Sequence, residues 1–229
     1  MDKREWSDKL KQLRSIIKKN ECLEEAKELI LDLHQMVYAS EMSGINSTTF
    51  EDKLWNGINE ETARKAVNKK GRTILYGIWH STRIEDITMN LLVAGTEQIF
   101  EKDNWFSKIN SPIRHTGNSL DANEILQMSL LVNIEELKAY RITVGRNTEN
   151  IIRKLSKGEM KRKVCKEKLQ RILDEKAVEN VDSANWLIDF WGGKDVAGII
   201  LMPCLRHQLV HLNESMDVES CKSNIPVLI

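Results

Sequence analysis

The spacing of apolar residues is the feature of this sequence that most restricts its fold. Over most of the chain, apolar side chains recur every three or four residues, which is the period of an amphipathic α-helix. No stretch alternates apolar and polar residues for long enough to suggest a β-strand. Because only three prolines and eleven glycines interrupt 229 residues, long helices can form without breaks. The pattern therefore predicts an all-α protein.

The periodic segments predict one domain that spans residues 1–229, since no internal repeat or linker separates them. A peripheral helix is expected within residues 1–20, and an insert over 156–193, charged and helical between 159 and 180, precedes the last core helix. Four such core helices would pack as an up-and-down four-helix bundle with additional peripheral helices. The expected core helices lie near 22–42, 72–94, 121–144 and 195–216, and the third bends or ends at Gly145.

Charge and cysteine content limit the classes of function. The 34 basic and 34 acidic residues cancel, so no overall positive field would attract a nucleic acid. The longest apolar run, Val196 to Cys204, is too short to span a membrane, and the charged first twenty residues do not resemble a signal peptide. The four cysteines are widely separated, which is typical of a reduced compartment. We expect a cytoplasmic protein with no nucleic-acid or membrane partner.

Two histidines in the last predicted helix have the spacing of a metal chelate. His207 and His211 are four residues apart, so both imidazoles lie on one helix face about one turn apart. His80 lies midway along another apolar helix, and facing helices of a bundle can share an ion. Pro203, just before the pair, should kink the helix or mark its start. Such a pair also arises by chance, and a lone histidine in an apolar helix is often a hydrogen-bonded core residue.

Five other residues could take part in the chemistry of such a site. His34 could donate a proton or act as a fourth ligand, or be a core histidine. Glu85 and Glu214 follow His80 and His211 closely, so either could support a ligand or act as a general base, or be a helix-end charge. Arg83 and Arg206 could hold an anionic substrate or cofactor, or extend into solvent. The general base is therefore not identified by the sequence.

The segments around these histidines resemble the DinB-like (damage-inducible) superfamily. The resemblance rests on 78–86, which contains His80, and on 202–214, which contains the H-x-x-x-H pair, and it extends over roughly 21–216. It implies a four-helix bundle with one ligand on the second core helix and two on the last. Members characterised as enzymes include thiol S-transferases that use bacillithiol or mycothiol and a mycothiol-dependent isomerase. The chain departs from the transferase pattern in its long 94–118 connection and its charged 159–180 insert.

Two functional hypotheses follow. The first is a metal-dependent enzyme, a thiol S-transferase or hydrolase, that acts on a small-molecule substrate; three neutral imidazoles suit zinc or nickel and leave a position for water or a thiolate. The second is a non-catalytic, metal-stabilised binding or dimerisation module of the stress response. A deep cleft beside the ion would favour the first, and a fourth protein ligand the second. A homodimer is also expected, because the helix from Ile74 to Leu92 is apolar on most of its circumference.

Overall fold

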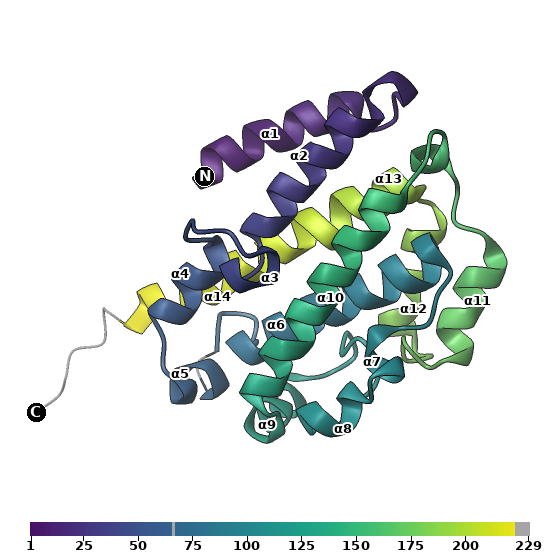
Figure 1. Cartoon of the computed structure of the whole chain (residues 1–229). Helices are drawn as coiled ribbons and strands as arrows, with labels where there is room; N and C mark the ends of the chain where they lie inside the picture. The colour runs from purple at the N-terminus through teal and green to yellow at the C-terminus, as the bar shows by residue number, and fades with distance from the viewer. Residues whose placement is uncertain (66, 223–229) are drawn as a thin grey trace, which may run out of the picture.

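The computed structural model describes residues 1–65 and 67–222, and in this part of the chain the regular secondary structure is helical (Figure 1). The β-type pairings it contains are isolated bridges, between Val67 and Thr73 and between Lys163 and Asp195. The all-α prediction is confirmed. None of the described helices combines the length and the apolar character needed to cross a lipid bilayer.

Four long helical stretches pack side by side in a closed ring. The first contacts the third and the fourth, and the second also contacts the third and the fourth. In chain order they are α2 (Leu23–Met36); α6 (Ile74–Ile87) continued by η2 (Thr88–Ala94); α10 (Ile134–Lys154); and α13 (Val196–Ile199) continued by η4 (Ile200–Arg206) and α14 (His207–Lys222).

The direction of the stretches differs from a simple up-and-down order. Asp86 of α6 contacts Tyr140 of α10, and Asn90 of η2 contacts Asn147 further along α10. The residue numbers of the contacting pairs increase in the same direction, so the two helices are parallel. The connection over 95–133 makes this possible, because it is long enough to return along the bundle before α10 begins. The expectation that successive core helices are antiparallel is wrong at this step.

The remaining helices surround the ring. The α1 helix packs on α2, α5 packs on α9, and α11 and α12 pack together at one end of the molecule, whereas α4 and α5 lie near the other end (Figure 1). These elements are α1 (Lys3–Ile16), η1 (Asn20–Cys22), α3 (Ser40–Ser43), α4 (Phe50–Asn56), α5 (Glu60–Lys65), α7 (Ile99–Lys102), α8 (Trp105–Ile109), α9 (Ala122–Leu131), η3 (Glu159–Lys161), α11 (Lys166–Asp174) and α12 (Asp182–Gly192).

The helix expected over 121–144 is two helices. It breaks at Val132, whose backbone is extended (ψ 141°), and the side chain of Asn133 then accepts a hydrogen bond from the backbone N–H of Glu136 as an N-cap of α10. The guanidinium of Arg64 donates to the carbonyls of Ser129 and Val132, which secures the break. A polar cap and a partner from another helix therefore end α9 without a glycine or a proline.

Two further boundaries differ from expectation. The α2 helix ends at Met36 rather than near residue 42, and Arg141 donates to the free carbonyl of Val37 at 2.7 Å. Gly145 does not end α10, which runs on to Lys154. A Cβ atom at this position would lie 2.8 Å from side-chain atoms of both Tyr38 and Met42. The glycine allows α10 to approach the segment after α2 closely. The expected 159–180 helix is likewise η3 followed by α11.

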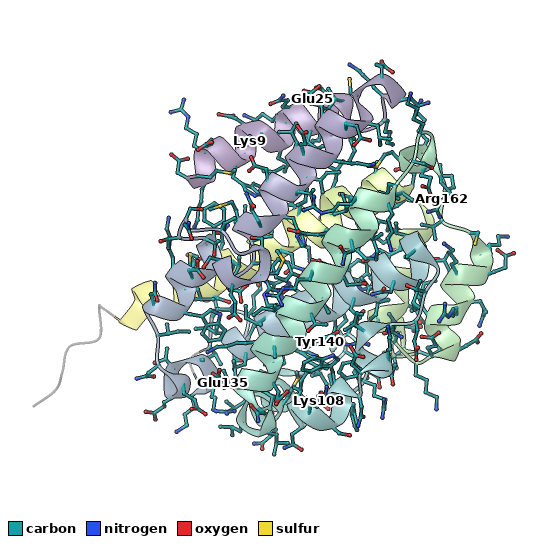
Figure 2. All side chains as sticks on the ribbon, in the orientation of Figure 1. Lys9, Glu25, Lys108, Glu135, Tyr140 and Arg162 are labelled. Carbon is teal, nitrogen blue, oxygen red and sulfur yellow. The ribbon has the colours of Figure 1, made fainter. Side chains whose placement is uncertain are left out.

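The apolar interior is one continuous cluster that draws on helices from α1 to α14. All residues of α6 are buried within the single chain, so the apolar circumference of this helix is satisfied by its own neighbours and gives no support to a dimer. Tyr140 on α10 is fully buried, and Figure 2 labels it together with the charged Lys9 on α1 and Glu25 on α2. A core of this extent holds α6 and α14 in fixed register.

Candidate metal centre

His80, His207 and His211 converge between α6 and α14. One ring nitrogen from each can be chosen so that all three lie within 4.8 Å of one another. The ring centroids of His80 are 5.1 Å from His207 and 5.0 Å from His211, and the latter two are 4.6 Å apart. His80 and His211 are each 4% exposed and His207 is half-buried. The structure therefore brings together the three histidines that the sequence singled out.

The packing of α6 on α14 places the histidines opposite each other. Gly77 lies one turn before His80, and a Cβ atom at this position would be 3.3 Å from the hydroxyl of Ser215 and 3.9 Å from His211. Glycine thus lets α14 approach α6 closely enough for imidazoles from both helices to meet. The register is fixed further by Gln208, whose side-chain amide donates to the backbone carbonyl of Ser81 at 2.9 Å.

A π-helical segment precedes the histidine pair. It covers Ile200–Arg206, contains Pro203, and passes directly into α14 at His207. Proline lacks the N–H that an α-helix needs at this point, and the wider turn accommodates it within a continuous helical run. Pro203 therefore does not mark the start of the helix, and the altered winding ends where the first candidate ligand begins.

One ring nitrogen of His80 is hydrogen-bonded to the protein backbone. Nδ1 lies 2.7 Å from the carbonyl oxygen of Thr116, so Nδ1 carries the hydrogen and Nε2 keeps a free lone pair. The ring also stacks on Tyr76, with centroids 5.4 Å apart and planes at 8°. The Tyr76 hydroxyl donates to the carbonyl of Gly117 at 3.0 Å. The loop at 116–117 thereby sets both the tautomer and the orientation of His80.

The other two histidines face each other through Nε2. The Nε2 atoms of His207 and His211 are 3.2 Å apart, and Nδ1 of His211 lies 3.3 Å from a carboxylate oxygen of Glu214. That contact does not have the alignment of a hydrogen bond. Nδ1 of His207 is buried without a hydrogen-bond partner. Converging nitrogens with few protein partners fit a shared cation better than they fit a satisfied core network.

Burial keeps the three imidazoles neutral. Loss of water contact, reinforced by His211, lowers the pKa of His80 to about 3. Burial and the neighbouring histidines hold the pKa of His207 well below its usual value, and burial also lowers that of His211 although Glu214 opposes the shift. The neutral form is the one that binds metal. Three nitrogen ligands without a thiolate suit zinc or nickel.

Two of the other predicted residues belong to a separate buried network. Nε2 of His34 lies 2.8 Å from one oxygen of Glu85, and the amide of Gln208 donates to the other oxygen at 2.8 Å. Arg141 donates to Gln208 at 2.9 Å and pairs with Glu51 at 2.7 Å. Glu85 thus has both oxygens occupied inside the bundle, and Gln208, the neighbour of His207, connects it to the histidine centre.

The two arginines are placed very differently. Arg83 is fully buried and donates to Asp86, to Gln98 and to the carbonyl of Arg114. It therefore ties the 95–114 connection to α6, and its donors are occupied by the protein. Arg206 is exposed at the end of the π-helical segment. Of the two, only Arg206 remains accessible to a ligand.

Sequence reasoning missed several residues of the centre. The partner of His80 is a backbone carbonyl, which no side-chain pattern reveals. Lys70 and Arg72 reach Glu214 from a turn 142 or more positions away along the chain. Gly77 was detectable in principle, since a glycine within a strongly helical, apolar segment often marks a close approach of two backbones.

A small polar cleft adjoins the centre. It is too narrow to hold a water-sized sphere and is lined by Asn68, Arg72, Thr73, Gly77, His211, Glu214 and Ser215. It lies on the Nδ1 side of His211, away from the Nε2 atoms that converge. As the side chains stand, the cleft therefore has no room for a water molecule.

Comparisons with known proteins do not assign the chain to a family, since neither a protein-family model nor a curated protein matches it.

Proposed function

We propose that this protein binds one divalent metal ion, zinc or nickel, through His80, His207 and His211, and that it is a metal-dependent enzyme of the DinB-like type. The observation that carries the proposal is the convergence of three neutral imidazoles from two helices, two of them buried and one half-buried, with a tautomer set on His80 by the Thr116 carbonyl. The order of the histidines along the chain and their place on the second and last core helices agree with the resemblance found in the sequence.

The proposed reaction is thiol S-transfer or hydrolysis on a small molecule. An ion held by His80, His207 and His211 with an open position would supply a Lewis acid for activating water or a thiolate. The chain's own residues orient the ligands: Thr116 holds His80, Tyr76 stacks on it, and α14 presents the other two imidazoles one turn apart. A low-molecular-weight thiol is the cofactor that the resemblance suggests. We retain the cytoplasm as the proposed location.

A second candidate is a metal-stabilised module without catalysis. It is favoured by the depth of the centre, because His80 and His211 are each only 4% exposed, and by the narrowness of the adjoining cleft, which does not hold a water-sized sphere. In this case the ion would link α6 to α14 and stabilise the fold. The homodimer likewise stays a prediction, which light scattering can test.

The proposal is tested by titrating metal-free protein with zinc and nickel in a calorimeter. Wild-type protein should bind one equivalent tightly, and His207→Ala should abolish tight binding because it removes one ligand of the chelate. Val210→Ala is the matched control, since Val210 lies between the two histidines on the same helix and is 40% exposed. Failure of the wild type to bind either metal would refute the proposal.

The enzyme and the module are separated by turnover. Metal-loaded wild-type protein should convert electrophilic substrates in the presence of a low-molecular-weight thiol, or hydrolyse activated esters and amides, and His207→Ala should not. Stoichiometric binding with no turnover across such a panel, together with a large rise in melting temperature on metal loading, would select the non-catalytic module.

A further inference from the structure

A short turn beside the metal centre presents two cations to Glu214. Asn68 shapes it: its side-chain oxygen accepts from the backbone N–H of Lys70 at 2.9 Å and of Arg72 at 3.1 Å, and its own N–H donates to the Arg72 carbonyl at 3.0 Å. Gly71 adopts a left-handed conformation (φ 71°), and a Cβ atom there would lie 2.8 Å from the Cβ atom of Ala122. The turn is therefore fixed by its own hydrogen bonds and by contact with α9.

The two cations engage both oxygens of one carboxylate. Nζ of Lys70 lies 2.7 Å from Oε1 of Glu214, and a terminal nitrogen of Arg72 lies 3.4 Å from Oε2. The same Oε2 lies 3.3 Å from Nδ1 of His211. The side chain of Glu214 is only 18% exposed, so it faces the centre rather than solvent. We refer to Lys70, Arg72 and Glu214 together as the carboxylate clamp.

The clamp is poorly explained as a stabilising surface feature. The side chain of Lys70 is 64% exposed, and exposed ion pairs of this kind contribute only about 0 to 1 kcal/mol to stability. Its effect on His211 is more specific. A negative oxygen opposite Nδ1 favours a hydrogen there and repels a lone pair, so it leaves the lone pair on Nε2. Nε2 is the atom that faces His207.

We propose that the carboxylate clamp is a positioning unit for the metal centre: Lys70 and Arg72 hold Glu214 against His211, and Glu214 fixes His211 in the tautomer whose Nε2 binds the ion. This inference rests on the proposed metal-binding function and deepens it, because it assigns the control of metal affinity to residues that touch no metal. Carboxylate partners of histidine ligands typically change metal affinity by about 10- to 100-fold.

The first test measures zinc affinity by competition with a chromophoric chelator. Glu214→Gln keeps the shape of the side chain and removes its charge, so affinity should fall about 10- to 100-fold. Replacing Lys70 and Arg72 together with glutamine leaves Glu214 in place but unheld, and should give a smaller loss in the same direction. Glu149→Gln is the matched control, because Glu149 is 13% exposed and pairs with Arg153 on α10. It should leave affinity unchanged.

The second test reads the tautomer of His211 directly in metal-free protein, by long-range ¹H–¹⁵N NMR of the imidazole. Wild-type protein should show the Nδ1–H form, and Glu214→Gln should shift it toward the Nε2–H form, an effect that a merely structural residue would not produce. An unchanged tautomer in Glu214→Gln would overturn the inference, as would affinity within twofold of wild type. If wild-type protein binds no zinc, the proposed function fails, and the tautomer comparison still decides whether the clamp positions His211.

Discussion

Acid should destabilise the metal-free protein, and His80 should account for a defined part of the effect. The folded state holds His80 neutral down to a pKa of about 3, whereas an unfolded chain protonates it near pH 6.5. Above pH 6.5 both states carry the neutral ring, and pH has no effect through this residue. Between pH 6.5 and 3 the unfolded chain binds a proton that the folded chain does not, so falling pH favours unfolding.

The size of the effect follows from the width of that window. One pH unit of unequal protonation is worth about 1.4 kcal/mol, so lowering the pH from 7 to 5 should cost about 2 kcal/mol through His80 alone. His207 and His211 add to this cost in the same direction, because burial lowers the pKa of both. At pH 5 the carboxylates of the unfolded chain are still largely ionised, so they contribute little in this range.

Urea denaturation of protein treated with a chelator, at pH 7 and at pH 5, measures the change. His80→Asn removes the titrating ring and places an amide N–H where Nδ1 donates to the Thr116 carbonyl, so it should lose about 2 kcal/mol less than wild type between the two pH values. Val210→Ala should show the wild-type pH dependence. Equal losses for wild type and His80→Asn would refute the reasoning, since His80 would then titrate alike in both states.

Three further predictions concern the folded chain. A hundredfold excess of zinc over its dissociation constant should stabilise the protein by about 2.7 kcal/mol and raise the melting temperature by about 5 to 10 °C in a thermal scan, with no rise in His207→Ala. Asp86→Ala should lower the free energy of unfolding by about 3 to 5 kcal/mol in urea, because Asp86 is the buried partner of Arg83 and accepts from Tyr140 at 2.7 Å; a loss below 1 kcal/mol would contradict this. The homodimer prediction expects light scattering to give the mass of two chains, and the mass of one chain at high concentration would contradict it.

The parts of the fold that depend on local pattern were predictable from the sequence. The 3.6-residue period identifies the core helices, and the four-residue spacing of His207 and His211 fixes their common face whatever packs against it. The break between α9 and α10 also had a signal, because Asn133 followed three residues later by Glu136 is typical of a helix start. The apolar residues on both sides obscured it.

The parts that depend on long-range contact were not predictable. Nothing in the sequence indicates that α6 and α10 are parallel, since this follows from the path of the 95–133 connection. The same holds for Arg83, for which the sequence suggests a role in substrate binding, whereas its guanidinium donates to Asp86, Gln98 and a backbone carbonyl. The residue type and its neighbours in the sequence do not reveal which partners a side chain contacts in the folded protein.

Anomalous diffraction at the zinc absorption edge, from crystals of zinc-loaded protein purified without an affinity tag, tests the central claim most directly. The account predicts one strong peak per chain, about 2.0 to 2.1 Å from a ring nitrogen of each of His80, His207 and His211, with at least one coordination position not filled by the protein. The absence of a peak between these three rings, or a peak held by other residues, would contradict it.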